Sequence, residues 1–233
     1  MFSLGLQLLL AAAPNIYKLF TSDDKTEAVK DLTKNVVQNV GKEFGVDFES
    51  KDEYKKINRT YFLINRKHYE AFLVLIDYQH SPSAFVLART ILETFVKSCY
   101  LEYIEKPKDT LINDFLMEIK KFPKLYDMAN KLESYTHPSC SKFEGFFKQF
   151  LKKELATYEK LSFFSHSNGK YIQAFNEKGS VNLSQEDVFN VMNLMHKMFI
   201  SSALFHLLAF EYFDELKLLT KIYESDLVTQ NRT

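Results

Sequence analysis

Several residue types are scarce in this 233-residue chain, and each scarcity narrows what the protein can be. The two cysteines, Cys99 and Cys140, give neither a disulfide framework nor a metal-ligand spacing, which argues against a secreted, disulfide-stapled domain and favours the cytoplasm. Six glycines and five prolines are few, which favours long helices over many turns. Because 30 basic and 30 acidic residues balance, the chain lacks the basic excess of a general nucleic-acid binder.

The chain has no long apolar run either. Phe2 to Ala13 is apolar at most positions, but twelve residues are too few to span a bilayer, and the segment lacks the basic leader of a signal peptide. We expect residues 1–46 to form a helical hairpin whose first helix docks on the body of the protein or on another subunit. The alternative is a helix within residues 2–20 that lies in a membrane interface.

What the chain does have is helical periodicity almost throughout, with 46% hydrophobic residues to build a core. The pattern predicts an all-α helical bundle of residues 50–224, followed by a polar tail of residues 225–233. Ser184 and Asp187 have the spacing of a capping box and predict the start of the last helix. The helices that we expect in the bundle cover residues 51–79, 82–103, 110–135 with a kink at Pro123, 142–166 and 184–223, with an exposed connection at 169–183.

Arginine is rare, and Arg89 is set in one of the most apolar of these helices. Glu93 follows it at i,i+4 spacing, so the two side chains point out of the same side of the helix. One interpretation is a solvated strip that also includes Lys97. The other is a partly buried arginine, held by Glu93 and directed into a cleft, where a guanidinium can bind phosphate with two parallel hydrogen bonds.

A second polar signature, Ser162-x-x-x-His166, ends a Phe-rich helix. Tyr158, Ser162 and His166 recur every four residues and therefore share a face. The helix dipole favours a protonated His166 in the last turn, and the usual pKa of histidine is near neutrality, so His166 could act as an acid or a base. The alternative is a structural histidine that satisfies carbonyl groups at the helix end.

The motifs of the chain include no zinc or di-metal ligand spacing and no glycine-rich phosphate loop, so we expect neither a metal nor another cofactor. The run from Ser83 to Phe95, which contains R-x-x-x-E, and the later run from Tyr158 to His166, which contains L-S-x-x-x-H, resemble an uncharacterised bacterial group similar to the HEPN superfamily. That resemblance covers roughly residues 51–223 and implies a helical bundle. Many HEPN proteins are metal-independent RNases of toxin–antitoxin and antiviral defence systems, and they commonly form homodimers.

The resemblance implies a site in which Arg89, Glu93 and His166 are catalytic and Tyr158, Lys160, Ser162 and Asn168 bind RNA. In the HEPN pattern an arginine precedes the histidine by five to seven positions, whereas this chain has Lys160 there. Arg89 would therefore have to supply the guanidinium from the other helix. The implied partners are RNA, a second copy of the chain and an antitoxin or defence protein. Two alternatives remain: a non-catalytic module that binds a partner protein or a nucleotide, and a membrane-acting effector.

Overall fold

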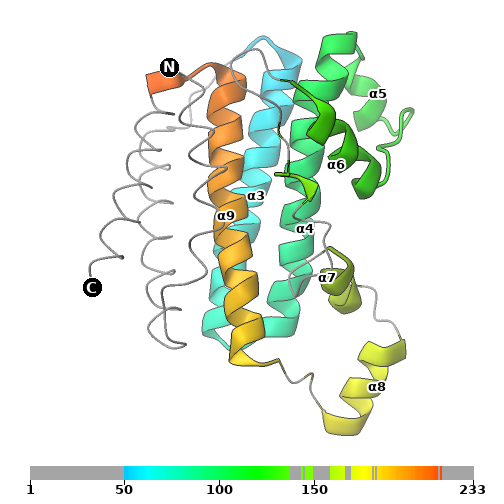
Figure 1. Cartoon of the computed structure of the whole chain (residues 1–233), viewed down its shortest axis with the longest axis vertical. Coiled ribbons are helices and arrows are strands. Elements are labelled where there is room, and N and C mark those ends of the chain that lie inside the picture. The colour runs from blue at the N-terminus through cyan, green and yellow to red at the C-terminus, as the bar shows by residue number, and fades with distance from the viewer. Residues whose placement is uncertain are drawn as a thin grey trace.

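The computed structural model describes residues 50–136, 143, 145–148, 158–165, 169–179, 181, 183–214 and 216. The elements in this part of the chain are all helical, so the predicted all-α fold is confirmed. The predicted hairpin (1–46) and tail (225–233) lie outside the described residues. The α-helices are α3 (Glu53–Asp77), α4 (Ser81–Tyr100), α5 (Ile112–Leu116), α6 (Leu125–Ser134), α7 (Tyr158–Ser165), α8 (Gly169–Lys178) and α9 (Gln185–Phe210) (Figure 1).

Three long helices, α3, α4 and α9, lie side by side and form the body of the described structure (Figure 1). Helix α4 contacts both of the others and also α6 and α7, so it is the central element. It continues into a π-helix (Leu101–Glu105) and a 3-10 helix (Lys106–Lys108), after which Asp109 adopts a left-handed conformation with φ 53°. Arg89 and Glu93 therefore lie on the central helix, and Ser162 lies on α7, which contacts it.

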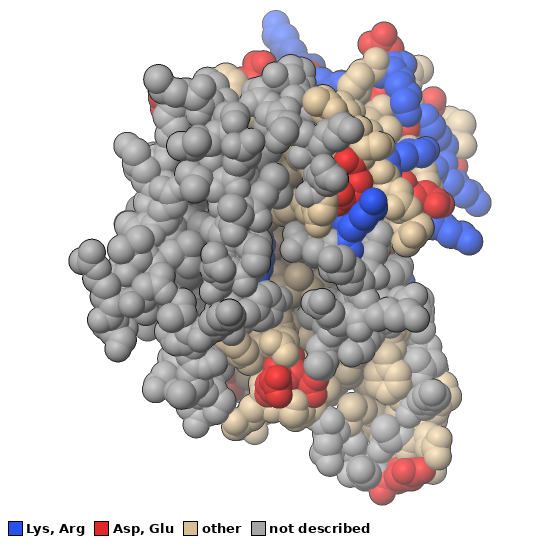
Figure 2. All heavy atoms as spheres, viewed as in Figure 1, with Lys and Arg blue, Asp and Glu red and all other residues tan. Residues whose placement is uncertain are grey.

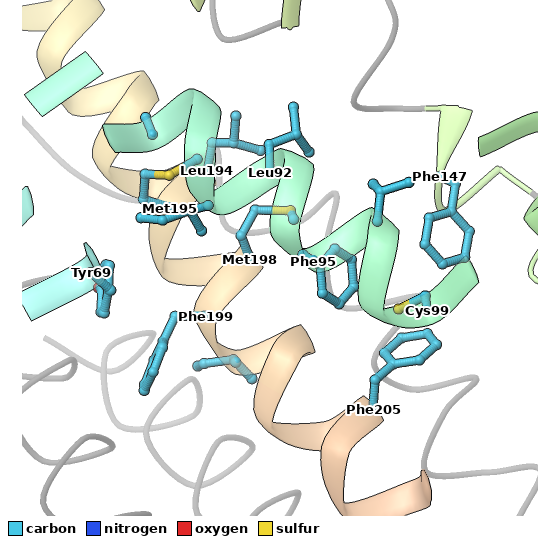
Figure 3. Close-up of a cluster of buried hydrophobic side chains, with 14 of the residues drawn as sticks. Tyr69, Leu92, Phe95, Cys99, Phe147, Leu194, Met195, Met198, Phe199 and Phe205 are labelled. Atoms are coloured by element: carbon cyan, nitrogen blue, oxygen red, sulfur yellow. The ribbon is translucent and has the colours of Figure 1, made fainter. Parts of the chain in front are cut away.

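The core between α4 and α9 combines aromatic and methionine side chains with aliphatic ones (Figure 3). Tyr69 of α3 stacks on Phe199 of α9 with 4.7 Å between ring centroids, and Phe95 of α4 meets Phe205 edge-on at 5.6 Å. Burying each such ring stabilises the fold by roughly 1.5–3 kcal/mol, which outweighs weak local helix propensity. Cys99 is a buried free thiol, and burial raises its pKa well above the usual value.

Helix α9 is the one described helix that is long and apolar enough to cross a membrane. However, 89% of its apolar stretch is buried inside the protein, which is typical of a central core helix. The predicted capping box is present at its start, where Ser184 Oγ accepts from Asp187 N at 3.0 Å and Asp187 accepts in return from Ser184 N.

Two of the predicted boundaries are wrong in the middle of the chain. Residues 110–135 form two short helices, α5 and α6, joined by a non-helical segment around Pro123, because Phe115 and Phe122 turn inward and pack on each other with 4.7 Å between centroids. The connection expected at 169–183 contains helix α8 instead. Of the helix expected at 142–166, the described part is α7 together with a short turn around Phe146, which is buried in the core.

The helix predicted to reach Tyr223 is interrupted: α9 ends at Phe210, and helical conformation resumes at Phe213 and Asp214. Glu211 adopts the left-handed conformation with φ 62°, and Tyr212 N donates to Leu207 O at 3.0 Å. This closing pattern usually carries glycine, which has no Cβ to strain. Because glutamate occupies this position, the usual sequence signal for the end of a helix is absent here.

Candidate functional site

Helix α4 presents Arg89 and Glu93 on one side, as their spacing predicts. Arg89 Nε donates to Glu93 Oε1 at 3.0 Å. The Arg89 side chain is only 13% exposed and that of Glu93 is 28% exposed, so the pair is partly buried rather than a solvated strip. Lys97 is not an extension of it, since its Nζ lies 5.5 Å from the ring centre of Phe122.

Helix α7 supplies a third member of this site, Ser165. Arg89 Nη1 donates to Ser165 Oγ across 76 positions of the sequence, and Ser165 Oγ in turn donates to the Ser162 carbonyl oxygen in its own helix at 3.3 Å. The guanidinium is therefore hydrogen-bonded to both helices. We call Arg89, Glu93, Ser162 and Ser165 the α4–α7 junction.

Apolar contacts hold α7 in place beside the junction. Leu161 is 1% exposed and belongs to the main core, and Phe164 packs edge-on against Phe85 with 5.0 Å between centroids. Phe85 lies one turn before Arg89 on the same side of α4. The apolar contact and the polar contact therefore come from one helix face, which fixes α7 against α4 along that face.

The structure brings together some of the predicted site residues and leaves others undescribed. Arg89, Glu93 and Ser162 meet at the junction. Tyr158 and Lys160 lie on α7, but their side chains are outside the described part of the structure, as are His166 and Asn168 altogether. The convergence of Arg89 with His166 therefore stays a prediction. Ser165 was missed, although an arginine inside an apolar helix signals that acceptors must come from a neighbouring element.

A different polar group lies inside the bundle, between α3, α4 and α9. Asn65 Nδ2 donates to Ser202 Oγ at 3.1 Å, and the Thr94 hydroxyl donates to Asn65 Oδ1. Asn65 is completely buried. These neutral groups satisfy one another and fix how the three helices are aligned, which is a packing role.

Two histidines of α9 are also buried. His196 Nδ1 lies 3.4 Å from Tyr69 Oη, and the ring of His206 stacks on Phe62 at 4.8 Å. Burial lowers the pKa of each to about 4, and the nearby charges of Lys197 and Arg59 respectively add to the effect. Both are therefore neutral packing groups at pH 7. No group of three or more metal-ligating side chains occurs among the described residues.

The second missed cluster surrounds Glu105, at the end of the π-helix. Its carboxylate accepts hydrogen bonds from Tyr100 Oη at 2.8 Å, Thr110 Oγ1 at 2.9 Å, Lys108 Nζ at 3.2 Å and Lys120 Nζ. Burial acts to raise the pKa of Glu105, but these donors outweigh it and hold the pKa at about 2. Glu105 thus remains ionised, and its hydrogen bonds hold in place the segment that follows α4.

No protein-family model matched the chain, and neither did any curated protein or any solved structure.

Proposed function

We propose that this chain is a HEPN-like bacterial defence or toxin protein that cleaves RNA without a metal. Arg89 would hold the scissile phosphate, Glu93 would orient Arg89, and His166 would act as the acid–base group. The observation that supports this most is the hydrogen bond from Arg89 to Ser165, the residue covalently joined to His166. It links the helix of the first signature to the end of the second.

The chemistry that suits these groups is attack by the ribose 2′-hydroxyl on the adjacent phosphorus, with loss of the 5′ oxygen. His166 would take the proton from the 2′-hydroxyl or give one to the leaving oxygen, since an imidazole with a pKa near neutrality can do either. A guanidinium stays charged and offers paired donors to the phosphate oxygens as negative charge develops. Tyr158, Lys160, Ser162 and Asn168 would bind the flanking RNA, and we expect the active form to be a homodimer.

The experiment is to measure RNA cleavage by the purified chain in EDTA. Wild type should cleave, and His166→Ala should lose roughly 10²–10⁴-fold of the rate, the usual contribution of acid–base catalysis. His68→Ala, which removes a half-buried histidine of α3, is the matched control and should cleave like wild type. If wild type cleaves no RNA, or if His166→Ala is as active as the control, the RNase proposal fails.

A second candidate, a non-catalytic helical module, is favoured by one specific observation. Arg89 is 13% exposed and bonds two groups of the protein itself, which is also what a structural fastener between α4 and α7 would do. On this account His166→Ala would change only the melting temperature. The partner would then be a protein, such as an antitoxin, or a nucleotide.

A further inference from the structure

The segment of residues 111–124, between the end of α4 and α6, exposes a group of aliphatic side chains at one end of the bundle. Leu111, Leu116, Met117 and Ile119 are each between 54% and 76% exposed. Single exposed apolar residues are ordinary, but four within nine positions form a local surface that water solvates poorly. We call these four residues the aliphatic edge.

The segment is anchored, so this exposure belongs to its folded conformation. Ile112 and Phe115 are buried with Leu101 in a small apolar cluster of their own, against which Phe122 packs. The chain turns back on itself where Lys120 N donates to Asp114 O at 2.8 Å. Because Ile112 and Phe115 point inward, residues close to them in the sequence, Leu111, Leu116 and Met117, are left at the surface.

A buried carboxylate holds the start of this segment close to Lys120, which lies nearer its end. Glu105 accepts from Thr110, just before the segment, and from Lys120 within it. The Lys120 ammonium also lies 5.1 Å from the ring centre of Phe115. Because Glu105 is fixed in the π-helix that extends α4, the aliphatic edge is attached rigidly to the central helix of the bundle.

Basic side chains flank the aliphatic edge. Residues 111–124 contain three lysines, Lys120, Lys121 and Lys124, and two acidic residues, Asp114 and Glu118. Lys121 and Lys124 are exposed, and neither forms an ion pair within the described part of the chain. Figure 2 shows basic side chains, with acidic ones among them, at the end of the molecule that carries α5 and α6. An exposed aliphatic surface next to unpaired positive charge is complementary to a surface that is apolar below and anionic above.

We propose that residues 111–124 dock on an anionic phospholipid bilayer. The aliphatic edge would enter the interface, where it leaves water, and Lys121 and Lys124 would meet the phosphate and carboxylate groups of the lipids. RNA fits this surface less well, because bases stack on aromatic rings, whereas the exposed apolar side chains of residues 111–124 are aliphatic and the exposed ring of Tyr126 lies just beyond them. Arg89 precedes Leu101 by twelve residues, about 18 Å along the helix axis, so docking would leave the α4–α7 junction away from the lipid.

The test is sedimentation of the full-length protein with vesicles. Wild type should bind mixed phosphatidylcholine–phosphatidylserine vesicles and should bind pure phosphatidylcholine much less. Met117→Gln/Ile119→Gln and Lys121→Glu/Lys124→Glu should each lower the bound fraction about tenfold or more, since apolar burial and charge both contribute. The matched controls are Val74→Gln and Lys67→Glu, at exposed positions of α3, and they should bind like wild type.

Three results would overturn the proposal. The first is that wild type does not sediment with the anionic vesicles. The second is that both double variants of residues 111–124 bind as well as the controls. Any membrane binding would then come from elsewhere, for example residues 2–20. The third is that the lysine variant weakens binding of single-stranded RNA while the Met117 and Ile119 variant changes nothing, which would make this an RNA surface. Thermal unfolding of each variant shows that the fold is intact.

Discussion

The molecule contains two Arg–Glu pairs of identical spacing, Arg66 with Glu70 on α3 and Arg89 with Glu93 on α4. Their bonds are almost the same length, 2.9 Å and 3.0 Å from Nε to Oε1. They differ in their surroundings. The side chains of the α3 pair are 31% and 33% exposed, and a surface lysine, Lys67, shares Glu70. Arg89 is 13% exposed and reaches across to Ser165 of another helix.

An R-x-x-x-E spacing therefore does not by itself identify a functional site. On α3 the pair lies at the surface. Water and salt screen its charges there, so its net contribution to stability is small. On α4 the same two residues lie where α7 excludes part of the water, so their charges interact more strongly and each depends on the other.

The largest expected effect is a loss of stability in acid, and it must be separated from any loss of activity. For the buried His196 and His206 the pKa in the fold is about 4, against the usual 6.5. As pH falls below 6.5 the unfolded chain binds protons that the folded chain does not, so stability falls between pH 6.5 and 4. The loss is about 2 kcal/mol per histidine from pH 7.5 to 5.

Denaturant unfolding at pH 7.5, 6 and 5 measures this dependence. His206→Phe keeps the stacking partner of Phe62 without the titrating group, so it should remove about half of the slope. An unchanged slope would mean that the buried histidines do not account for it. With the slope known, an acid limb in RNA cleavage that persists in His206→Phe can be assigned to another group, such as His166.

The next effect compares the two arginines directly. Arg89→Ala leaves Glu93 partly buried and Ser165 without its donor, and should lower the free energy of unfolding by about 1.5–3 kcal/mol. Arg66→Ala removes only a surface pair and should cost about 0.5 kcal/mol or less. Chemical denaturation of both variants gives the two numbers. Equal costs would show that the α4 pair is no more embedded than the α3 pair.

The smallest effect is the coupling energy within each pair. A double-mutant cycle with Arg89→Met and Glu93→Gln should give about 1 kcal/mol, because Arg89 is only 13% exposed, against 31% for Arg66. The corresponding cycle at Arg66 and Glu70 should give about 0.3–0.5 kcal/mol, the usual value for exposed i,i+4 pairs. Added salt should reduce the second coupling more than the first. The reverse salt dependence would contradict the burial argument.

The features of the fold that could be predicted from the sequence are those that depend on local interactions. The long helices, the capping box of Ser184 and Asp187 and the contact between Arg89 and Glu93 depend on spacings of three or four residues, and all were predicted. The break between α5 and α6 was not. There Phe115 and Phe122 turn inward to form a small cluster with residues of α3, and this tertiary packing overrides a run of helix-forming residues.

Only part of the candidate site could be predicted from the sequence, for the same reason. Sequence spacing alone cannot distinguish Arg89 from Arg66, because the burial of Arg89 depends on where α7 packs. Ser165 was missed because its contact with Arg89 spans 76 positions and follows no local rule. The early end of α9 was missed because Glu211 occupies a position where glycine is the usual signal.

RNA cleavage by Arg89→Lys, compared with cleavage by Arg66→Lys, shows whether Arg89 binds the scissile phosphate. Both substitutions keep the charge and remove the planar fork that binds phosphate through two hydrogen bonds. If the α4–α7 junction binds the scissile phosphate, Arg89→Lys should cleave at least about tenfold more slowly than wild type while remaining folded, and Arg66→Lys should be fully active. Equal cleavage by the two variants, or no cleavage by wild type, would contradict the account and leave Arg89 as a structural fastener between two helices.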